Sequence, residues 1–459
     1  MGRTPARKNQ IKEGFMTTSK VTLISLIILV LGIATFFYLF GPQQAISQDL
    51  TPTLSAETET CLGCHNNTMP ATVAQWKDSR HYENGVGCFE CHQANEGDPD
   101  AMSHMGMTIA VIVSPNDCAR CHQEVVDQFM ASHHASAAAF TGSLDNFLGE
   151  VVEGTAAAVQ GCQQCHGSTV KVLEDGKLDP STWPNTGVGR INPDGTNGAC
   201  TACHARHSFS KAQARRPENC GKCHMGPDHP QIEIYNESKH GIQFYAHVDD
   251  MNLESDSWVV GEDYYSAPTC ATCHVSATRD LPVTHDVGDR ISWTLRPPIS
   301  TKLENWESRR TDMLNVCEAC HNPEFTGNFF TQYDAAVDLY NTKFAQPGVE
   351  IMTWLLDNGK RTASPFDDEV EWVWYEIWHH EGRRARHGAS MMGPDYVQWH
   401  GFYEVAKHFY FEFIPLAREL GAGELVDQIL ARPEHAWRQG LSPEEIQAQI
   451  EFYRNRYGQ

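Results

Sequence analysis

Residues 200–241, CTACHARHSFSKAQARRPENCGKCHMGPDHPQIEIYNESKHG, decide the fold of this chain. They hold two Cys-x-x-Cys-His units, at 200–204 and 220–224. This signature attaches c-type haem. The two thiols form thioether bonds to the macrocycle, and the histidine that follows them becomes the first axial ligand of the iron.

The same stretch contains further imidazoles that could act on a haem. His207, His229 and His240 are each candidates for a second axial ligand. His229 also follows Asp228 directly, and an adjacent acid and imidazole can move protons in catalysis. From spacing alone His229 is explained equally well as a distal ligand, with Asp228 as a loop residue.

The haem signature accounts for every cysteine of the chain. The 16 cysteines form eight complete units. A disulfide framework or zinc ribbons would not place a histidine after every second cysteine. We therefore expect eight haems c per chain. Their attachment cysteines are Cys61, Cys64, Cys88, Cys91, Cys118, Cys121, Cys162, Cys165, Cys200, Cys203, Cys220, Cys223, Cys270, Cys273, Cys317 and Cys320, and their first axial ligands are His65, His92, His122, His166, His204, His224, His274 and His321.

The spacing of the units and the composition predict the fold class. The units leave little protein per macrocycle, so porphyrins must form much of the core and lie close enough to exchange electrons. No long run of strand-like alternation occurs. We expect a mainly α multihaem cytochrome c fold, with a haem-packed N-terminal domain and long C-terminal helices. A net charge of −23 argues against nucleic acid as a partner.

The chain divides into five predicted segments. Residues 1–20 are a basic tail, which we expect in the cytoplasm, and residues 21–40 are uncharged and long enough to cross a membrane. A cleaved signal peptide is the alternative, although its apolar part should be only about 7–15 residues long. Residues 41–60 form a polar linker, residues 61–321 the octahaem domain, and residues 322–459 a helical region expected to serve oligomerisation. The haem domain is then periplasmic, anchored to the inner membrane by the N-terminal helix.

Three long helices are predicted after the last cysteine. The first covers residues 366–392, with a proline and two acids at its start. The second covers 398–420. The third covers 441–457, where Ser442 and Glu445 have the spacing of a capping box.

A repeated pattern selects several candidates for the distal haem ligands. The pattern aromatic-x-x-Ser-x-His occurs at 76–81, 129–134 and 235–240, each time outside an attachment unit. Ordinary surface histidines are the alternative. The predicted distal ligands, in order of preference, are His81, His134, His207, His240, His104, His285 and His380, with His133 a close rival of His134 and His379 of His380.

The sequence resembles the octahaem hydroxylamine oxidoreductase family. Besides the eight units, the resemblance is carried by ARRPENCGKCHMGPDHPQ (214–231), SKHG (238–241) and HHEGRRARHGASMMGPDYVQWHG (379–401). It covers about residues 60–420. The family implies a mainly helical homotrimer that oxidises hydroxylamine to nitric oxide or nitrite at one five-coordinate haem. The remaining haems would carry the electrons to a c-type cytochrome or a quinone-linked partner.

The resemblance also implies site residues. The catalytic haem is that of the fourth unit, at 162–166, and Asp228 and His229 match the family's acid–imidazole pair above it. Tyr264 or Tyr265 is the nearest match to a pocket tyrosine. Tyr396 is the candidate for the tyrosine that, in the oxidising branch, a neighbouring subunit bonds to the catalytic porphyrin.

Two alternatives to hydroxylamine oxidation stay open. A reductive branch of the same family lacks the tyrosine bond and reduces nitrite or hydroxylamine to ammonia. A protein whose haems are all six-coordinate would conduct electrons without catalysis.

Overall fold

The structure is a computed structural model that describes residues 52–139 and 143–458. The predicted tail and the predicted transmembrane anchor lie outside these residues. Within the described ranges, no helix combines the length and the apolar character that crossing a membrane requires.

The first helix begins inside the predicted linker. Helix α2 (Ala56–Thr68) starts five residues before Cys61 because Ser55 caps it, its hydroxyl accepting a hydrogen bond from the amide of Thr58. The helix then runs through the first attachment unit, so the unit is held on a regular backbone from its first cysteine onward.

Short helices joined by loops carry the attachment units, as predicted. Most units begin inside or at the start of a helical turn, which brings the two thiols of a Cys-x-x-Cys spacing to the same side. The remaining helices of this region are α3 (Pro70–Lys77), α4 (Arg80–Glu83), α5 (Cys88–His92), α6 (Pro115–Ala131), α7 (Leu144–Phe147), α8 (Thr155–Gln160), α9 (Cys162–His166), α10 (Lys211–Arg215), α11 (Pro217–Gly221), α12 (Gln231–Glu237), α13 (Lys239–Ala246), α14 (Cys270–His274) and α15 (Trp306–Glu318), with π-helical turns at Leu148–Gly154 and 3-10 turns at Cys200–Ala202 and Val248–Met251.

One small sheet was not predicted from the sequence, in which no long run of strand-like alternation occurs. Strands β1 (Ala101–His104) and β2 (Met107–Ala110) form an antiparallel hairpin. Its two turn residues, Met105 and Gly106, both have positive φ, the geometry of a tight hairpin turn. Four-residue strands are too short to show alternation in the sequence. The hairpin places the predicted ligand His104 at its tip.

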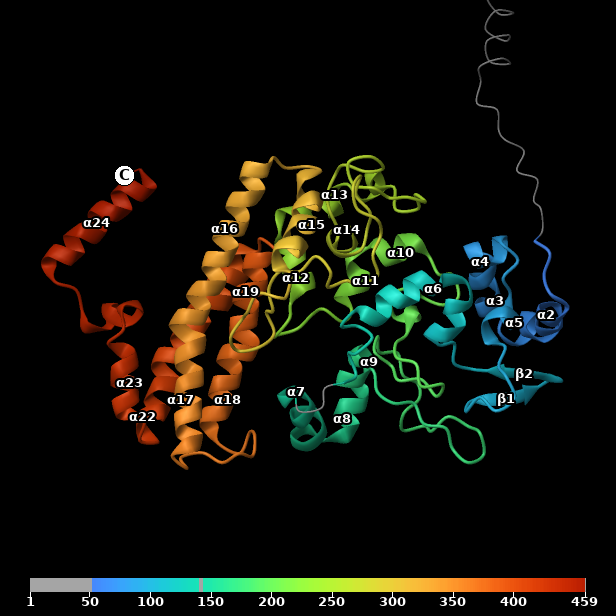
Figure 1. The fold of residues 1–459 in the computed structure, drawn as a ribbon, viewed down its shortest axis with the longest axis horizontal. Helices are drawn as coiled ribbons and strands as arrows, with labels where there is room; N and C mark the ends of the chain where they lie inside the picture. Colours follow the sequence, from blue (N-terminus) through green and yellow to red (C-terminus); the bar gives the residue numbers. More distant parts are fainter. Residues whose placement is uncertain (1–51, 140–142, 459) are drawn as a thin grey trace, which may run out of the picture. The chain divides into compact units, whose positions relative to one another are not determined.

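The C-terminal helices pack around the largest apolar core of the described chain. Aromatic side chains dominate this core, including Tyr340, Trp374 and Phe409. Helix α16 packs on α19, and α17 on α23 (Figure 1). The elements are α16 (Pro323–Tyr340), α17 (Gln346–Asp357), α18 (Glu369–Tyr375), α19 (Gly382–Ser390), α20 (Pro394–Val397), α21 (Glu404–His408), α22 (Ile414–Glu419), α23 (Gly423–Leu430) and α24 (Pro443–Tyr457), with π-helical segments at Asn341–Ala345, Glu376–Glu381, Gln398–Tyr403 and Phe409–Phe413 and a 3-10 segment at Pro433–Gln439.

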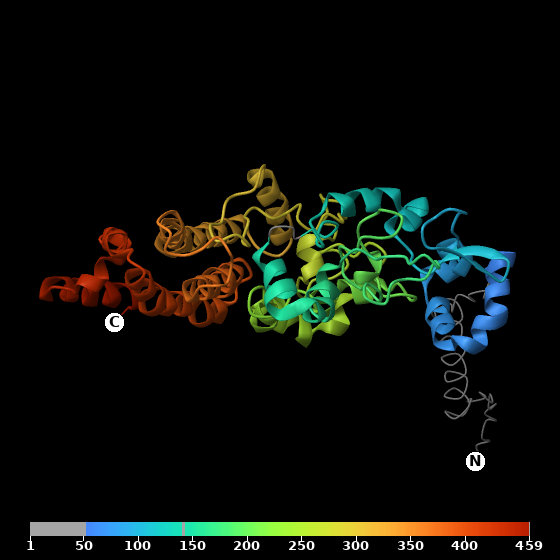
Figure 2. The same ribbon diagram turned by 90° about the horizontal axis from the view of Figure 1, so that it is seen from below.

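The three predicted C-terminal helices exist with shifted ends. The first begins at Glu369 rather than at residue 366, because Phe366 has a φ of 65° and cannot continue a right-handed helix. The second begins earlier than predicted, at Pro394. The third has the predicted capping box, carries no buried residue, and forms the C-terminal end of the ribbon (Figure 1, Figure 2).

Candidate functional site

Five pairs of histidine rings in the described chain have the separation that a shared haem iron requires, and in three of them the attachment histidine has a single such neighbour. A metal–imidazole bond is about 2 Å long and the ring centre lies about 1 Å beyond the nitrogen, so two rings on opposite sides of one iron have centres about 6 Å apart. The ring centres are 6.3 Å apart for His65 and His104, 6.3 Å for His81 and His122, and 6.1 Å for His240 and His321. Each of these three pairs joins an attachment histidine to a predicted distal ligand.

Two attachment histidines are also oriented for metal binding. Nδ1 of His92 donates to the carbonyl of Ala110 at 2.9 Å, and Nδ1 of His274 to that of Val287 at 3.1 Å. A hydrogen bond at Nδ1 fixes the tautomer and leaves Nε2 unprotonated for the iron. All sixteen cysteines are free thiols. The donor set therefore fits c-type haem.

The aromatic-x-x-Ser-x-His repeat is a turn that presents the histidine. In each copy the serine hydroxyl donates to the carbonyl of the aromatic residue three positions earlier, at 2.6 Å for Ser79, 2.6 Å for Ser132 and 2.7 Å for Ser238. These serines are 1–2% exposed. The bond closes the last turn of one helix, which ends at Lys77, Ala131 or Glu237, and the histidine follows two residues after the serine.

Three further predicted distal ligands, His285, His207 and His134, also lie near attachment histidines. Burial and the neighbouring His285 lower the pKa of His204 to about 4. Burial and the neighbouring His92 also lower the pKa of His207. The ring of His134 lies 6.0 Å from that of His224.

Contacts between thiols of different units show which haems would be neighbours. The thiols of Cys118 and Cys200 are within hydrogen-bonding distance, and so are those of Cys165 and Cys223. The second contact joins the fourth unit, at 162–166, to the sixth. A haem attached at 162–166 would therefore have a haem attached at 220–224 as a neighbour.

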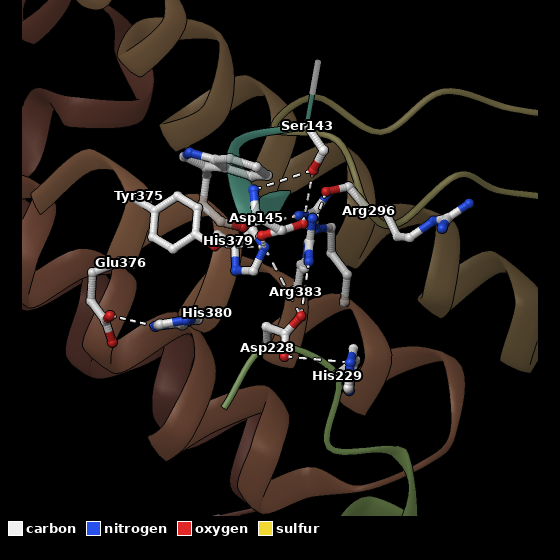
Figure 3. Close-up of polar contacts among 12 residues, drawn as sticks. Ser143, Asp145, Asp228, His229, Arg296, Tyr375, Glu376, His379, His380 and Arg383 are labelled. Atoms are coloured by element: carbon white, nitrogen blue, oxygen red, sulfur yellow. Dashed lines mark hydrogen bonds and ion pairs between the residues drawn. The ribbon is translucent and has the colours of Figure 1, made fainter. Parts of the chain in front are cut away.

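The structure separates the rival residues His379 and His380. Nδ1 of His380 lies 2.5 Å from a carboxylate oxygen of Glu376, and its ring contacts are Tyr375 and His379. In the described chain no ring contact joins His380 to an attachment histidine. His379 is 4% exposed and lies beside Asp145, whereas His380 lies beside Glu376 (Figure 3).

Asp228 and His229 lie in a loop that folds back on the sixth attachment unit. The amide of Ile232 donates to the carbonyl of His224, which closes the loop. Nε2 of His229 lies 3.7 Å from Oδ1 of Asp228, too far for a hydrogen bond but close enough for charge interaction. Asp228 Oδ2 accepts from Arg383 at 3.0 Å. The ring of His229 lies 6.1 Å from that of His224, so His224 has two ring neighbours at ligand-like separation.

A second carboxylate, which the sequence did not indicate, lies beside this pair. Asp145 Oδ1 is 2.5 Å from both the Tyr375 hydroxyl and Nε2 of His379 (Figure 3). The same His379 nitrogen lies 4.0 Å from Oδ2 of Asp228. Asp145 also lines a pocket together with Cys162 and His166. Two aspartates from distant segments thus meet at one imidazole next to the fourth attachment unit.

One helical face assembles most of this site. Tyr375, His379, Arg383 and His387 recur every four residues through α18, the π-helical segment Glu376–Glu381 and α19. In an α-helix a four-residue step overshoots one turn by about 40°. A π-helical segment turns less per residue and offsets that drift, so the four side chains stay on one face. The regular four-residue spacing was the available sequence signal for this face.

Comparisons with known proteins show which multihaem proteins the chain is similar to. Residues 192–364 match the family model described as seven times multi-haem cytochrome CxxCH, and residues 41–93 that of cytochrome c554 and c-prime. A solved structure titled hypothetical multiheme protein has a TM-score of 0.72 and 26% identity, covering 81% of this chain and 97% of that chain. The Kuenenia stuttgartiensis reducing HAO-like protein complex shares the fold, with a TM-score of 0.62 at 18% identity over 82% of this chain and 87% of that chain.

A curated relative adds the enzyme family. It is a probable nitrite reductase-hydroxylamine oxidoreductase fusion protein of Kuenenia stuttgartiensis, 24% identical over 60% of this chain. The match covers 35% of that relative's length. These comparisons support a multihaem protein that resembles the hydroxylamine oxidoreductase family. The mainly α multihaem cytochrome fold and the family resemblance are thereby confirmed.

In the described chain, no hydrogen bond or ring contact joins the tyrosines named from the resemblance to Asp228 or His229. Tyr264 is 1% exposed, stacks on Trp258, and its hydroxyl hydrogen-bonds with Thr272 at 2.7 Å. Tyr265 is 70% exposed. Tyr396 is half-buried in α20, 5.6 Å ring to ring from His400. Tyr375, which the sequence did not indicate, is the tyrosine that hydrogen-bonds with Asp145.

Proposed function

We propose that this chain is an oxidoreductase that oxidises hydroxylamine to nitric oxide or nitrite at a haem attached through residues 162–166. The observation that carries the proposal is the partly buried group of charged side chains beside His166. Burial and the nearby His229 lower the pKa of His166, while the carboxylates of Asp145 and Asp228 act in the opposite direction. Proton-accepting side chains therefore surround the fourth attachment unit, where the chemistry would need them.

The chain's own residues would handle protons. Haem, when bound, supplies an iron that holds the substrate nitrogen and accepts its electrons. Conversion of hydroxylamine to nitric oxide releases three protons with three electrons, and conversion to nitrite consumes one water and releases five protons with four electrons. His229 accepts these protons, and the neighbouring Asp228 stabilises the imidazolium that results. Arg383 holds Asp228 in place through its 3.0 Å hydrogen bond.

Reduction toward ammonia is the second candidate. It is favoured by the name of the curated relative, which covers nitrite reduction as well as hydroxylamine oxidation. The same residues would then donate protons to the departing oxygens. An electron conduit without catalysis would leave the Asp228 and Asp145 groups without a role.

Three measurements separate these functions. Steady-state assays with hydroxylamine plus an electron acceptor, and with nitrite plus a reductant, show which direction is faster. A ferric high-spin signal in the electron paramagnetic resonance spectrum is expected for either enzyme. A protein with no such signal and no turnover in either assay would be a conduit. Mass spectrometry of the haem peptide 162–166 tests the oxidising branch, since a second peptide joined through Tyr396 would identify it.

Cofactor number, location and assembly belong to the same proposal. We expect eight haems c, a homotrimer, and a c-type cytochrome or quinone-linked redox partner. We also expect a periplasmic haem domain anchored to the inner membrane through residues 21–40. Fractionation of cells that produce the full chain, with and without residues 1–40 replaced by a cleavable signal, tests the anchor. Release of a haem-loaded protein only after the replacement is the expected result.

A further inference from the structure

Asp145 occupies a position between the fourth attachment unit and the C-terminal helices. Its amide donates to the hydroxyl of Ser143, which caps the short helix α7. This bond fixes the position of Asp145 in the first turn of that helix. Its side chain is 38% exposed and lines the pocket that also contains Cys162 and His166. A single carboxylate thus faces the pocket on one side and the helix Glu369–Ser390 on the other.

Two donors from that helix hold Asp145 tightly. The Tyr375 hydroxyl and Nε2 of His379 both reach Oδ1 at 2.5 Å. Burial would raise the pKa of Asp145, but hydrogen bonds from His379 and Tyr375 hold that pKa well below its usual value. The carboxylate is therefore ionised at neutral pH and accepts both bonds. A carboxylate that accepts from Nε2 fixes the tautomer and the ring direction of the imidazole.

The same helix face connects Asp145 to Asp228. Nε2 of His379 is much closer to Asp145 than to Asp228, at 2.5 Å against 4.0 Å. Asp228 is left with Arg383, whose Nε is itself anchored on the carbonyl of Arg296 at 2.9 Å. If Asp145 lost its charge, His379 could turn to Asp228 and compete with Arg383. The bond at Asp145 thus keeps Oδ1 of Asp228 directed at His229.

We propose that Asp145 is a positioning residue of the site, which acts through His379 to keep Asp228 paired with Arg383 and His229. This inference rests on the proposed function for its reaction. It concerns a residue that the family resemblance did not supply. Asp145 does not need to touch the substrate, and its effect is expected on the rate of turnover rather than on substrate binding.

A double-mutant cycle in the haem-loaded full chain tests the proposal. Asp145→Asn keeps the shape of the side chain and removes its charge, and His379→Gln removes the imidazole. We expect kcat to fall at least about 10-fold in each single variant, with KM within twofold of the wild type. Because Asp145 acts through His379, the kcat of the double variant should lie within about twofold of the kcat of His379→Gln. A double variant whose loss equals the product of the two single losses would overturn the proposal, and so would Asp145→Asn with unchanged kcat.

Controls separate positioning from general stabilisation. Asp334 is another partly buried aspartate, held by Arg310 at 2.7 Å and by Trp293 at 2.8 Å, outside this cluster. Asp334→Asn should lower the melting temperature while kcat stays near the wild-type value. If Asp145→Asn does not accumulate with full haem content, Tyr375→Phe serves as the test variant in its place. It removes only one hydroxyl and should lower kcat several-fold with KM unchanged. Unchanged kcat in Tyr375→Phe would then overturn the proposal. A wild-type protein inactive in both directions would refute the proposed function itself, whereas the variant-to-wild-type ratio reports on Asp145.

Discussion

At the scale of single residues, His229 is the side chain on which two interpretations diverge. Its ring has a ligand-like separation from that of His224, yet its Nε2 lies 3.7 Å from Oδ1 of Asp228 and its charge helps to lower the pKa of His166. His387 adds a third imidazole near His224, and burial among Arg386, Arg383 and these histidines lowers the pKa of His387 far below its usual value. His224 therefore does not depend on His229 for a partner ring.

Replacing His229 by alanine distinguishes a proton acceptor from a ligand. For a proton acceptor we expect the number of high-spin haems to stay at one, while turnover falls by about 10²–10⁴-fold. Asp228→Asn should also slow turnover, because it removes the charge beside the imidazolium, and should leave the haem spectrum unchanged. Electron paramagnetic resonance and steady-state assays on the same preparations check both. A new high-spin haem in His229→Ala at a preserved rate would show that His229 is a ligand.

Individual site residues could be predicted only where the sequence brought them together. Asp228 and His229 are adjacent, and the attachment histidines follow their cysteines, so both were visible. Asp145 comes from a segment some eighty positions earlier, and no local pattern connects it with His379. The sequence ranked His380 above His379 as a candidate ligand without knowing the direction of either ring. That direction depends on the π-helical segment Glu376–Glu381.

At the scale of secondary-structure elements, the serine of the repeated turn closes the last turn of one helix and thereby positions the histidine that follows it, a predicted haem ligand. In the third copy, Ser238 ends α12 and also caps α13, accepting from the amide of Gly241 at 3.1 Å. Ser238→Ala should cost about 1 kcal/mol of stability and loosen His240 above the haem of His321. We expect a lower melting temperature and a weakened low-spin signal. Ser442→Ala removes a cap on the exposed helix α24 and should leave the haem spectrum unchanged.

The helix Glu369–Ser390 has a second titratable group away from the site. Glu381 is 1% exposed and hydrogen-bonded to His408, and burial together with nearby Glu376 raises its pKa from 4.5 to about 9. A raised carboxyl pKa means that the folded state loses stability as the pH rises from 4.5 to about 9. Glu381→Gln lacks that loss. Its free energy of unfolding should exceed the wild-type value by an amount that grows with pH and reaches about a few kcal/mol, and its melting temperature should rise accordingly.

Thermal unfolding between pH 5 and pH 8 measures this difference, and Glu376→Gln is a control of opposite sign. The hydrogen bond from His380 lowers the pKa of Glu376, so this variant should be less stable than the wild type at neutral pH and recover as the pH falls. A pH-independent difference between Glu381→Gln and the wild type would contradict the burial argument.

Helix positions were predictable and helix ends less so. A proline with two acids and a capping box located the first and the third C-terminal helix, but the start of the first depends on the positive φ of Phe366, which composition does not reveal. The π-helical segments have no sequence signature in a single chain. They matter here because they align Tyr375, His379 and Arg383 on one face.

At the scale of the whole molecule, the haems are expected to be part of the fold. The described chain brings the rings of His65 and His104, and of His240 and His321, to ligand-like distances although these residues are far apart in sequence. Such pairs hold segments together only when an iron lies between them. Binding of a metal group that joins distant segments contributes directly to folding. We therefore expect chain maturation and haem attachment to be inseparable.

Haem content is the measurement that checks this expectation for the complete chain. Sixteen cysteines in eight complete units, all of them free thiols in the structure, provide eight attachment sites. Pyridine haemochrome absorbance per chain and the intact mass of the matured protein should both give eight haems. Replacing Cys317 and Cys320 by serine should give seven, with loss of the low-spin signal assigned to His321 and His240 and a large fall in yield, because α15 would no longer be tied to α13. Six or seven haems in fully matured wild-type protein would contradict the assignment of every unit as a haem site.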